Sequence, residues 1–522
     1  MGEFRRYPAG VQDFEVIRKE GFVYVDKTQY IYDLAHTQGN AIFLSRPRRF
    51  GKSLLCSTMK CYFQGRRDLF EGLAIDRLET EWTQYPVLHF DMSRAKNRDV
   101  EKVKDNLEYQ LSVYEQEYGT NPVSSNLGDR LEWLVAQAHR QTGNKTVLIF
   151  DEYDSPMLEV IDDKGKMADV RCLLTEFYGP VKSMGEHLRF VFLTGITKFS
   201  QMSIFSTINN LTNISMFPEW EGICGITAQE LVDNFSPEIS AIAKREGFSD
   251  DQALARLRQQ YDGYSFGPSL TEVYNPYSLL NAFASGILDD YWFAPGTPSS
   301  LIKVLANYRF NLSDIEGVEL FSRDLNQSFD NFATAVPMLY QSGYLTIKGY
   351  DRLDNVYTLG IPNREVYRGL YHTLLEYYID GDTTANTSLL LTVKRAMRRD
   401  DIAAAMTAVQ SYLASMPYEV FSARRNELDY ERDLRMIFEC IGIEVDTEVR
   451  NATGRCDVVI KTANKIYVIE LKIDDTATVD DALAQIDEKN YLIPYWNDPR
   501  PVVKVGAVLD RATRTIREWK IA

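Results

Sequence analysis

The chain has 522 residues, 45% of them hydrophobic and 25% charged, which is ordinary globular composition but too long for one compact domain. A net charge of −16 argues against a protein whose whole surface coats nucleic acid, although a local basic groove can still bind phosphates. No segment approaches the ~18 uninterrupted apolar residues of a membrane span, and the N-terminus lacks the apolar core of a secretory signal. The six cysteines form no CxxC pair, which suits a reducing compartment and gives no support to a structural zinc site, so we expect a cytoplasmic protein.

Residues 1–226 alternate short apolar runs with helical patterns, which is typical of a parallel α/β sheet. The strand candidates are rich in β-branched or large apolar residues and alternate little, as expected when helices cover both faces of a sheet. They span residues 41–46, 86–91, 146–151 and 190–194.

The first of these strands leads into a turn and a helical pattern, the arrangement of a phosphate-binding loop. Residues 46–53 read RPRRFGKS, so Lys52 can reach the terminal phosphates and the Ser53 hydroxyl can hold Mg²⁺. The usual pattern, GxxxxGK[ST], begins with glycine where this chain has Arg46. A basic strand-to-helix turn without function is the alternative for this motif alone. The predicted nucleotide-binding residues in this segment are Arg48, Arg49, Gly51, Lys52, Ser53 and Leu54.

Two adjacent acids at the end of another strand make the phosphate-loop interpretation stronger. Asp151 is predicted to support Mg²⁺, and Glu152 to polarise the water that attacks the γ-phosphate. Thr194, at the end of a further strand, is a candidate sensor of the γ-phosphate, or alternatively caps a turn. Possible cations for the site are Arg48, Arg49 and Lys198.

The remainder of the chain divides into three parts. Residues 227–378 are predicted to be mainly helical, with a winged helix as one interpretation. A small polar stretch at 380–388 is the best linker candidate, and helical sequence follows it, so residues 379–418 are predicted to form a helical linker. Residues 419–522 are predicted to form a small α/β domain that reads helix, three strands, helix, strand.

This last domain carries a second constellation of polar residues. Glu470 and Lys472 are two apart on a predicted strand and therefore share a face, and Asp457 on the neighbouring strand can meet them. Two carboxylates beside a lysine predict a Mg²⁺ site for attack on a phosphodiester. Gln485, on the following helix, is predicted to point into the site. Glu431 lies on an amphipathic helix that comes before the two strands. Strands that alternate apolar and charged residues without function are the alternative.

With both sites in view, the chain resembles bacterial AAA-ATPase-like proteins with a C-terminal PD-(D/E)XK nuclease-superfamily domain. The shared motifs are YVDKT at 24–28, RPRRFGKS at 46–53, FDEYD at 150–154, TGITK at 194–198, YDGY at 261–264, YNP at 274–276, GRCD at 454–457, IELK at 469–472 and QIDEKNY at 485–491. The resemblance covers nearly the whole chain, and Arg46 looks like this family's own form of the loop. It implies a P-loop core of the AAA/STAND kind with an additional strand, a helical middle region and a restriction-endonuclease-like tail. It also implies that the segment at 24–28 helps to frame the nucleotide.

Three functions are compatible with these residues. The leading hypothesis is an ATP-binding and ATP-hydrolysing protein with a Mg²⁺-dependent nuclease domain that acts on DNA. The second is a nucleotide-controlled signalling switch whose nuclease-like domain binds nucleic acid or a partner without cutting, in keeping with the acidic net charge. The third is a scaffold in which both sites have decayed, which the intact GKS, DE and ExK residues make least favoured. Oligomerisation is compatible with an AAA-related chain, although the sequence offers no readable interface.

Overall fold

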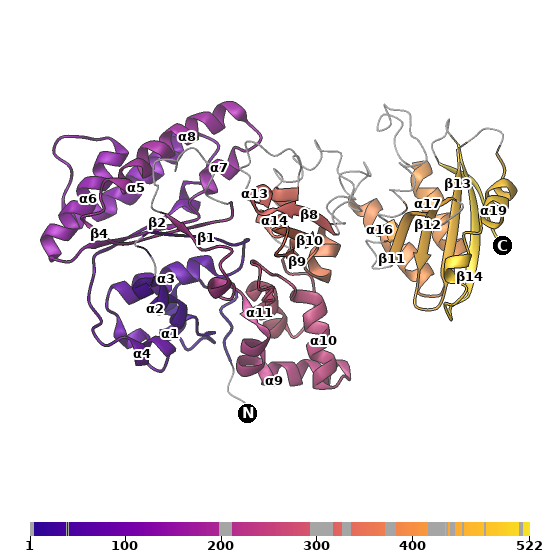
Figure 1. The fold of residues 1–522 in the computed structure, drawn as a ribbon, viewed down its shortest axis with the longest axis horizontal. Helices are drawn as coiled ribbons and strands as arrows, with labels where there is room; N and C mark the ends of the chain where they lie inside the picture. The colour runs from indigo at the N-terminus through magenta and orange to yellow at the C-terminus, as the bar shows by residue number, and fades with distance from the viewer. Residues whose placement is uncertain are drawn as a thin grey trace. The chain divides into compact units, whose positions relative to one another are not determined.

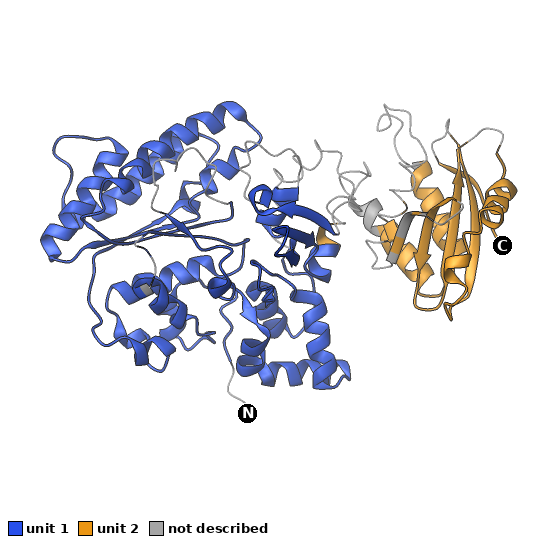
Figure 2. Ribbon diagram, viewed as in Figure 1, with its two compact units in different colours: residues 1–367 blue, residues 368–522 orange. Residues whose placement is uncertain are grey.

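The computed structural model describes residues 5–37, 39, 41–197, 211–292, 317–325, 336–370, 383–415, 434, 437–438, 444–450, 454–473, 477–510 and 515–522. These residues form two compact units, 1–367 and 368–522 (Figure 2). Within the described ranges, no helix is long and apolar enough to cross a membrane.

A parallel sheet forms the centre of the first unit. Its strands are β1 (Ala41–Ser45), β2 (Val87–Asp91), β3 (Thr146–Asp151), β4 (Leu188–Gly195) and β5 (Thr212–Asn213). They are arranged in the order β2-β3-β4-β1-β5, and every pairing is parallel. Strand β4 lies between the strand that enters the phosphate loop and the strand that ends in Asp151, so the additional-strand P-loop core is confirmed. The four strands expected from the apolar runs are present, with shifts of one or two residues at their ends.

Helices cover both faces of this sheet (Figure 1). One face carries α1 (Phe14–Lys19), α2 (Thr28–Thr37), α3 (Lys52–Phe63) and α4 (Ala74–Leu78). The other carries α5 (Val100–Tyr118), α6 (Leu127–Thr142), α7 (Ser155–Glu159) and α8 (Lys164–Tyr178). On this second face the rings of Phe90 and Phe150, from neighbouring strands, stack on each other and meet Phe177 of α8 edge to face. Burial on both sides explains why the strands read as nearly continuous apolar runs.

The rest of the first unit is less purely helical than expected. Its helices are α9 (Ala228–Glu246), α10 (Asp250–Tyr261), α11 (Pro276–Ser285), α13 (Ser322–Leu325) and α14 (Val336–Ser342). A short antiparallel pair joins β6 (Ile226–Thr227) to β7 (Val273–Tyr274). A second antiparallel sheet, of order β8-β10-β9, contains β8 (Val318–Phe321), β9 (Thr346–Asp351) and β10 (Val356–Gly360).

The order strand, helix, helix, strand, strand from β8 to β10 has the connectivity of a winged helix. The assignment stays a prediction, because residues 293–316 immediately before β8 lie outside the described ranges. Every residue of α14 except Ser342 is buried.

The second unit contains a mixed sheet of order β11-β12-β13-β14-β15. Its elements are α16 (Thr383–Met397), α17 (Ile402–Ser415), β11 (Glu444–Arg450), β12 (Arg455–Lys461), β13 (Ile466–Lys472), α19 (Val479–Glu488), β14 (Val502–Leu509) and β15 (Ile516–Ile521). Strands β13 and β14 are parallel and are connected through α19, whereas the other pairs are antiparallel. The sequence predicted one strand after α19, and the structure has two.

Helices α16 and α17 belong to this second unit by their contacts. The Asp400 carboxylate between them accepts a hydrogen bond from Asn464 Nδ2 (2.8 Å), and the Gln410 side chain of α17 donates to the Ile516 carbonyl (2.7 Å). Helix α16 already begins at Thr383, so the expectation of a non-helical break is wrong for residues 383–388. Polar residues are compatible with the first turn of a helix, which is why apolar periodicity did not reveal its start.

Candidate nucleotide and nuclease sites

The phosphate loop joins β1 directly to α3. Gly51 ends the loop with φ +89°, and Arg49 also has a positive φ of 68°. Lys52 begins α3 and is buried, with its Nζ donating to the Pro47 carbonyl across the loop (3.0 Å). The side chain that is predicted to reach the phosphates therefore already lies over the mouth of the loop.

Asp151, the last residue of β3, lies next to this loop. The Ser53 hydroxyl hydrogen-bonds to the Asp151 carboxylate, while Asp151 Oδ1 is buried and has no hydrogen-bond partner. Burial raises the pKa of Asp151 to about 6, against the opposing effect of the Ser53 hydrogen bond. A hydroxyl and a carboxylate with an unsatisfied oxygen are oxygen donors of the kind that Mg²⁺ prefers, so these residues fit the predicted ion.

Glu152 and Thr194 complete the predicted constellation. Glu152 has a left-handed backbone, φ 49°, which is uncommon for a non-glycine residue and is often found at functional sites. Thr194 is fully buried on β4 opposite Leu44 of β1, and its hydroxyl has no hydrogen-bond partner. Its carbonyl accepts from the backbone N–H of Tyr153, so the two strand ends that carry the predicted acids and sensor are directly tied (3.0 Å).

Asp154 is a residue of this site that the sequence prediction missed. Its buried Oδ2 accepts hydrogen bonds from the backbone N–H groups of Ile196 (3.0 Å) and Thr197 (2.6 Å). It therefore fixes the loop after the acidic pair to the end of β4. The motif at 150–154 ends in this aspartate, but its partners lie 42 and 43 residues away.

Arg46, in the place of the usual glycine, has a structural role that the sequence did not reveal. Its guanidinium is buried and donates to the carbonyls of Ser45 (2.9 Å), Ser215 (2.7 Å) and Trp220 (2.9 Å). It also lies over the ring of Phe266, 4.3 Å from the centroid. The side chain thus anchors the loop to later parts of the unit and is not directed at a nucleotide.

The two following arginines differ from each other. Arg49 donates to the Tyr291 carbonyl (3.0 Å) and stacks over the Tyr277 ring, so its guanidinium contacts the polypeptide of the middle region. Arg48 is half-buried in the same loop. Lys198, the third candidate cation, lies outside the described residues.

An apolar pocket of about 90 Å³ adjoins the loop. Gly51 and Leu54 line it from the loop and α3, and Tyr24 and Val25 line it from the segment that the resemblance associates with the nucleotide. Phe235 of α9 and Leu280 of α11 close it from the middle region. The predicted nucleotide-binding residues therefore lie on two sides of the loop. Lys52, Ser53 and Asp151 make its polar side, and Gly51 and Leu54 adjoin the apolar pocket.

The second site lies in the C-terminal unit, where β12 and β13 run antiparallel. Val458 pairs with Ile469, so Asp457 and Glu470, the next residues along the two antiparallel strands, lie opposite each other. Both acids are almost completely buried, at 7% and 1% exposed. Asp457 Oδ2 accepts a hydrogen bond from the backbone N–H of Leu471 (2.7 Å), which holds this carboxylate against β13.

Glu470, Lys472 and Gln485 form one hydrogen-bonded triangle. Lys472 Nζ donates to Glu470 Oε1 (3.0 Å) and to Gln485 Oε1 (2.6 Å), and Gln485 Nε2 donates to Glu470 Oε1. Gln485 thus points into the site from α19, as its position on that helix predicted. The donor set of two buried carboxylates beside a lysine fits a hard divalent cation such as Mg²⁺.

Close packing positions α19 for this contact. Gly506 of β14 faces the helix, and a Cβ atom there would come within 2.6 Å of the Val479 carbonyl. Tyr491 follows the helix, and its hydroxyl lies 3.4 Å from Gln485 Nε2. Neither residue was predicted from the sequence, although Tyr491 ends the motif at 485–491. Glu431 lies outside the described residues.

Comparison with known proteins gives matches to both parts of the chain. Residues 8–205 match the family model "Predicted AAA-ATPase", and residues 426–519 match "PD-(D/E)XK nuclease superfamily". An "Uncharacterized protein in vnfD 5'region" of Azotobacter chroococcum mcd 1 is 30% identical over 522 residues, which covers 98% of each chain.

Two solved structures of Aeropyrum pernix proteins are also similar. ORC1 in complex with DNA matches 67% of this chain and 91% of its own at 14% identity, with a TM-score of 0.23. ORC2 with ADPNP and ADP matches 64% and 87% at the same identity and TM-score. These values are too low for any argument about function. The chain belongs, by its full-length relative and its two domain matches, to the AAA-ATPase-like proteins that carry a C-terminal PD-(D/E)XK nuclease-superfamily domain.

Proposed function

We propose that this protein binds and hydrolyses ATP in its first unit and cleaves DNA with the help of Mg²⁺ in its second. The observation that carries the nuclease half is the triangle of Glu470, Lys472 and Gln485, with Asp457 beside it on the neighbouring strand. A lysine with two acceptors, one of them a buried carboxylate, is a positioned cation and not a solvated surface charge.

In the first unit, Lys52 exchanges its bond to the Pro47 carbonyl for the terminal phosphates of ATP. Ser53 and Asp151 hold Mg²⁺, which neutralises charge on the transferred phosphoryl group. Glu152 orients the attacking water, and Thr194 contacts the γ-phosphate. Leu54, which lines the apolar pocket beside the loop, contributes to nucleotide binding.

In the second unit, Asp457 and Glu470 are the proposed Mg²⁺ ligands. Mg²⁺ held there supplies a water of lowered pKa and stabilises the extra phosphoryl charge. Lys472 positions the water or neutralises the transition state, and Gln485 keeps the lysine at Glu470 through the two hydrogen bonds that it makes. DNA binds through a local groove, since the net charge of −16 does not favour binding over the whole surface.

The test is a cleavage assay with the full-length chain on plasmid and on single-stranded DNA, with and without Mg²⁺ and ATP. The wild type should cut only with a divalent cation, and Glu470→Ala should not cut while it still hydrolyses ATP. Persistent cleavage by Glu470→Ala would contradict the assignment of the nuclease site.

The same assay separates the competing function. A protein that hydrolyses ATP and binds DNA but cuts nothing with any metal would be a nucleotide-controlled switch. Gel filtration with and without ATP would then show whether the nucleotide changes the assembly.

A further inference from the structure

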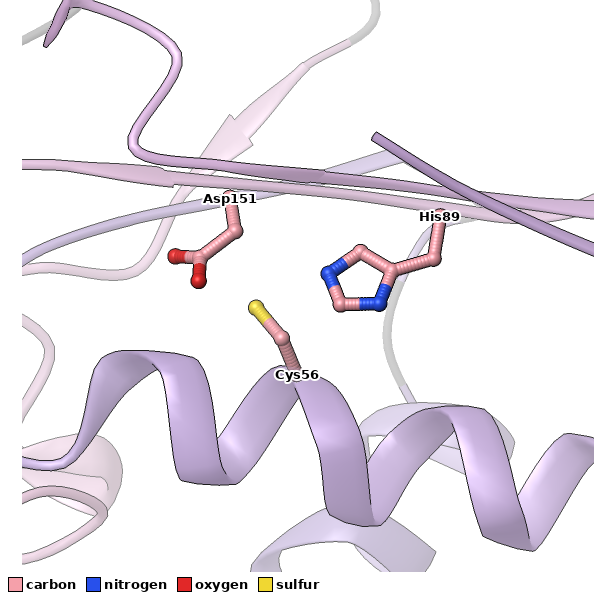
Figure 3. A group of neighbouring side chains, drawn as sticks. All are labelled: Cys56, His89 and Asp151. Atoms are coloured by element: carbon pink, nitrogen blue, oxygen red, sulfur yellow. The ribbon is translucent and has the colours of Figure 1, made fainter. Parts of the chain in front are cut away.

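A thiol, an imidazole and a carboxylate meet beside the phosphate loop, and the proposed ATPase uses only the carboxylate. Cys56 lies on α3 one turn after Ser53, His89 lies on β2, and Asp151 ends β3. One potential ligand atom from each of the three lies within 4.8 Å of the other two. Figure 3 shows Cys56 pointing up from the helix, and Asp151 and His89 pointing toward it from the sheet.

These atoms are buried and only partly satisfied. His89 Nε2 and Asp151 Oδ1 are both buried without a hydrogen-bond partner. Cys56 is a free cysteine and is fully buried. Buried polar atoms without partners are rare in proteins, and a bound ion is one of their ordinary explanations.

We propose that Cys56, His89 and Asp151 form a binding site for a thiophilic divalent cation, with Zn²⁺ as the reference ion. Zn²⁺ is bound by thiolate, imidazole and carboxylate in tetrahedral sites, whose ligand atoms lie about 3.5 Å apart. Closing a set that already lies within 4.8 Å requires side-chain movements of about 1 Å. A water completes the fourth position. Mg²⁺ prefers oxygen ligands alone, so the chemistry of this site differs from that of Ser53 and Asp151.

The protonation states of the His89 and Cys56 side chains affect metal binding in opposite directions. Burial lowers the pKa of His89 to about 4, so the ring is neutral and offers a lone pair at neutral pH. Burial raises the pKa of the Cys56 thiol, so the thiol is protonated before binding. On binding, the S–H bond breaks as the S–Zn bond forms, the proton leaves to solvent, and no electron is transferred.

One consequence rests on the proposed ATPase. Asp151 cannot serve Zn²⁺ and the Mg²⁺ of a bound nucleotide in the same way at the same time. A thiophilic metal is therefore expected to slow ATP hydrolysis by occupying the shared carboxylate.

The direct test uses Co²⁺, because a thiolate ligand gives Co²⁺ a charge-transfer absorption that carboxylate sites lack. Co²⁺ is titrated into the full-length chain without nucleotide, in the presence of a non-thiol reductant, and is then displaced by Zn²⁺. The wild type should show the band, Cys56→Ser should lose it, and His89→Gln should weaken Co²⁺ binding at least tenfold. Cys61→Ser is the matched control, because Cys61 is a buried free cysteine on the same helix outside the cluster.

Two results would overturn the proposal: no band in the wild type, or a band of equal strength and affinity in Cys56→Ser. If Cys56→Ser does not fold, alkylation of the unmodified chain replaces it. Zn²⁺ should then protect Cys56 at least tenfold from the reagent, and equal reaction rates with and without Zn²⁺ refute the site. Lys52→Ala should keep the Co²⁺ band while it loses ATP, so failure of the metal site and failure of the nucleotide site can be told apart.

Discussion

Arg46 allows a sharp test of why this phosphate loop lacks its usual first glycine. The substitution Arg46→Gly restores the common GxxxxGK[ST] pattern, so sequence reasoning alone expects equal or better ATP binding. The structure predicts the opposite, because the guanidinium satisfies three buried carbonyls, of Ser45, Ser215 and Trp220.

The size of the effect follows from these contacts. Each hydrogen bond from a charged donor contributes about 1.5 kcal/mol at the low end, and the stacking on Phe266 adds about 1 kcal/mol. The variant no longer has the desolvation penalty of a buried guanidinium, and this offsets part of the sum. The net loss in the free energy of unfolding is about 4 kcal/mol. With an unfolding entropy of about 2.1 cal/mol/K per residue, the first unit, residues 1–367, should lose roughly 5 °C in Tm.

Thermal unfolding followed by tryptophan fluorescence, together with binding of a fluorescent ATP analogue, measures both quantities. Arg48→Gly is the matched control, since it introduces the same backbone freedom in the same loop at a half-buried arginine. A Tm for Arg46→Gly within about 1 °C of the control, with ATP bound more tightly than by the wild type, would refute the reasoning.

Three further predictions concern single residues. Lys52→Ala should abolish ATP binding in equilibrium dialysis, whereas Lys60→Ala, further along α3, should bind as the wild type does. Glu470→Gln should reduce Mg²⁺-dependent DNA cleavage by at least about a hundredfold, because the metal loses a charged ligand, while the steady-state ATPase rate is unchanged; equal loss of both activities would contradict two separate sites. Burial raises the pKa of Glu365 to about 7 from 4.5, so its ionisation destabilises the fold progressively as the pH rises from 4.5 to 7. Glu365→Gln should therefore raise the free energy of unfolding at pH 8 by about 3 kcal/mol and leave it nearly unchanged at pH 4, in urea titrations where exposed Glu246→Gln shows no such difference.

The sequence was most informative about features that one short segment determines, such as the position of a strand or the face on which a side chain lies. The uninterrupted apolar runs located β1 to β4, because a strand buried on both faces has no polar alternation. The two-residue spacing of Glu470 and Lys472 placed both on one face of β13, and the hydrogen bond between their side chains agrees with that placement. The predicted roles of these residues in catalysis stay predictions.

Features that depend on distant partners were not accessible in the same way. The acceptors of the Arg46 guanidinium at Ser215 and Trp220 lie 169 and 174 residues away, so no local pattern indicated that the side chain is an anchor. Gln410 of α17 likewise has its hydrogen-bond partners at Thr515 and Ile516, 105 and 106 residues later. Local sequence does not encode such pairings, because the sequence pattern around a polar helix residue is the same whether or not a sheet packs against that residue.

The burial of α14 bears on the proposed binding of DNA. In a helix-turn-helix module, the corresponding helix enters the major groove and reads base edges with its side chains. Here Val336, Met338, Tyr340 and Gln341 are all hidden within the first unit, so α14 has no face to present to a groove. Discrimination between base sequences by this helix would require it first to leave its packing. On the proposed function, base readout is therefore expected from other parts of the chain and not from α14 in its packed position.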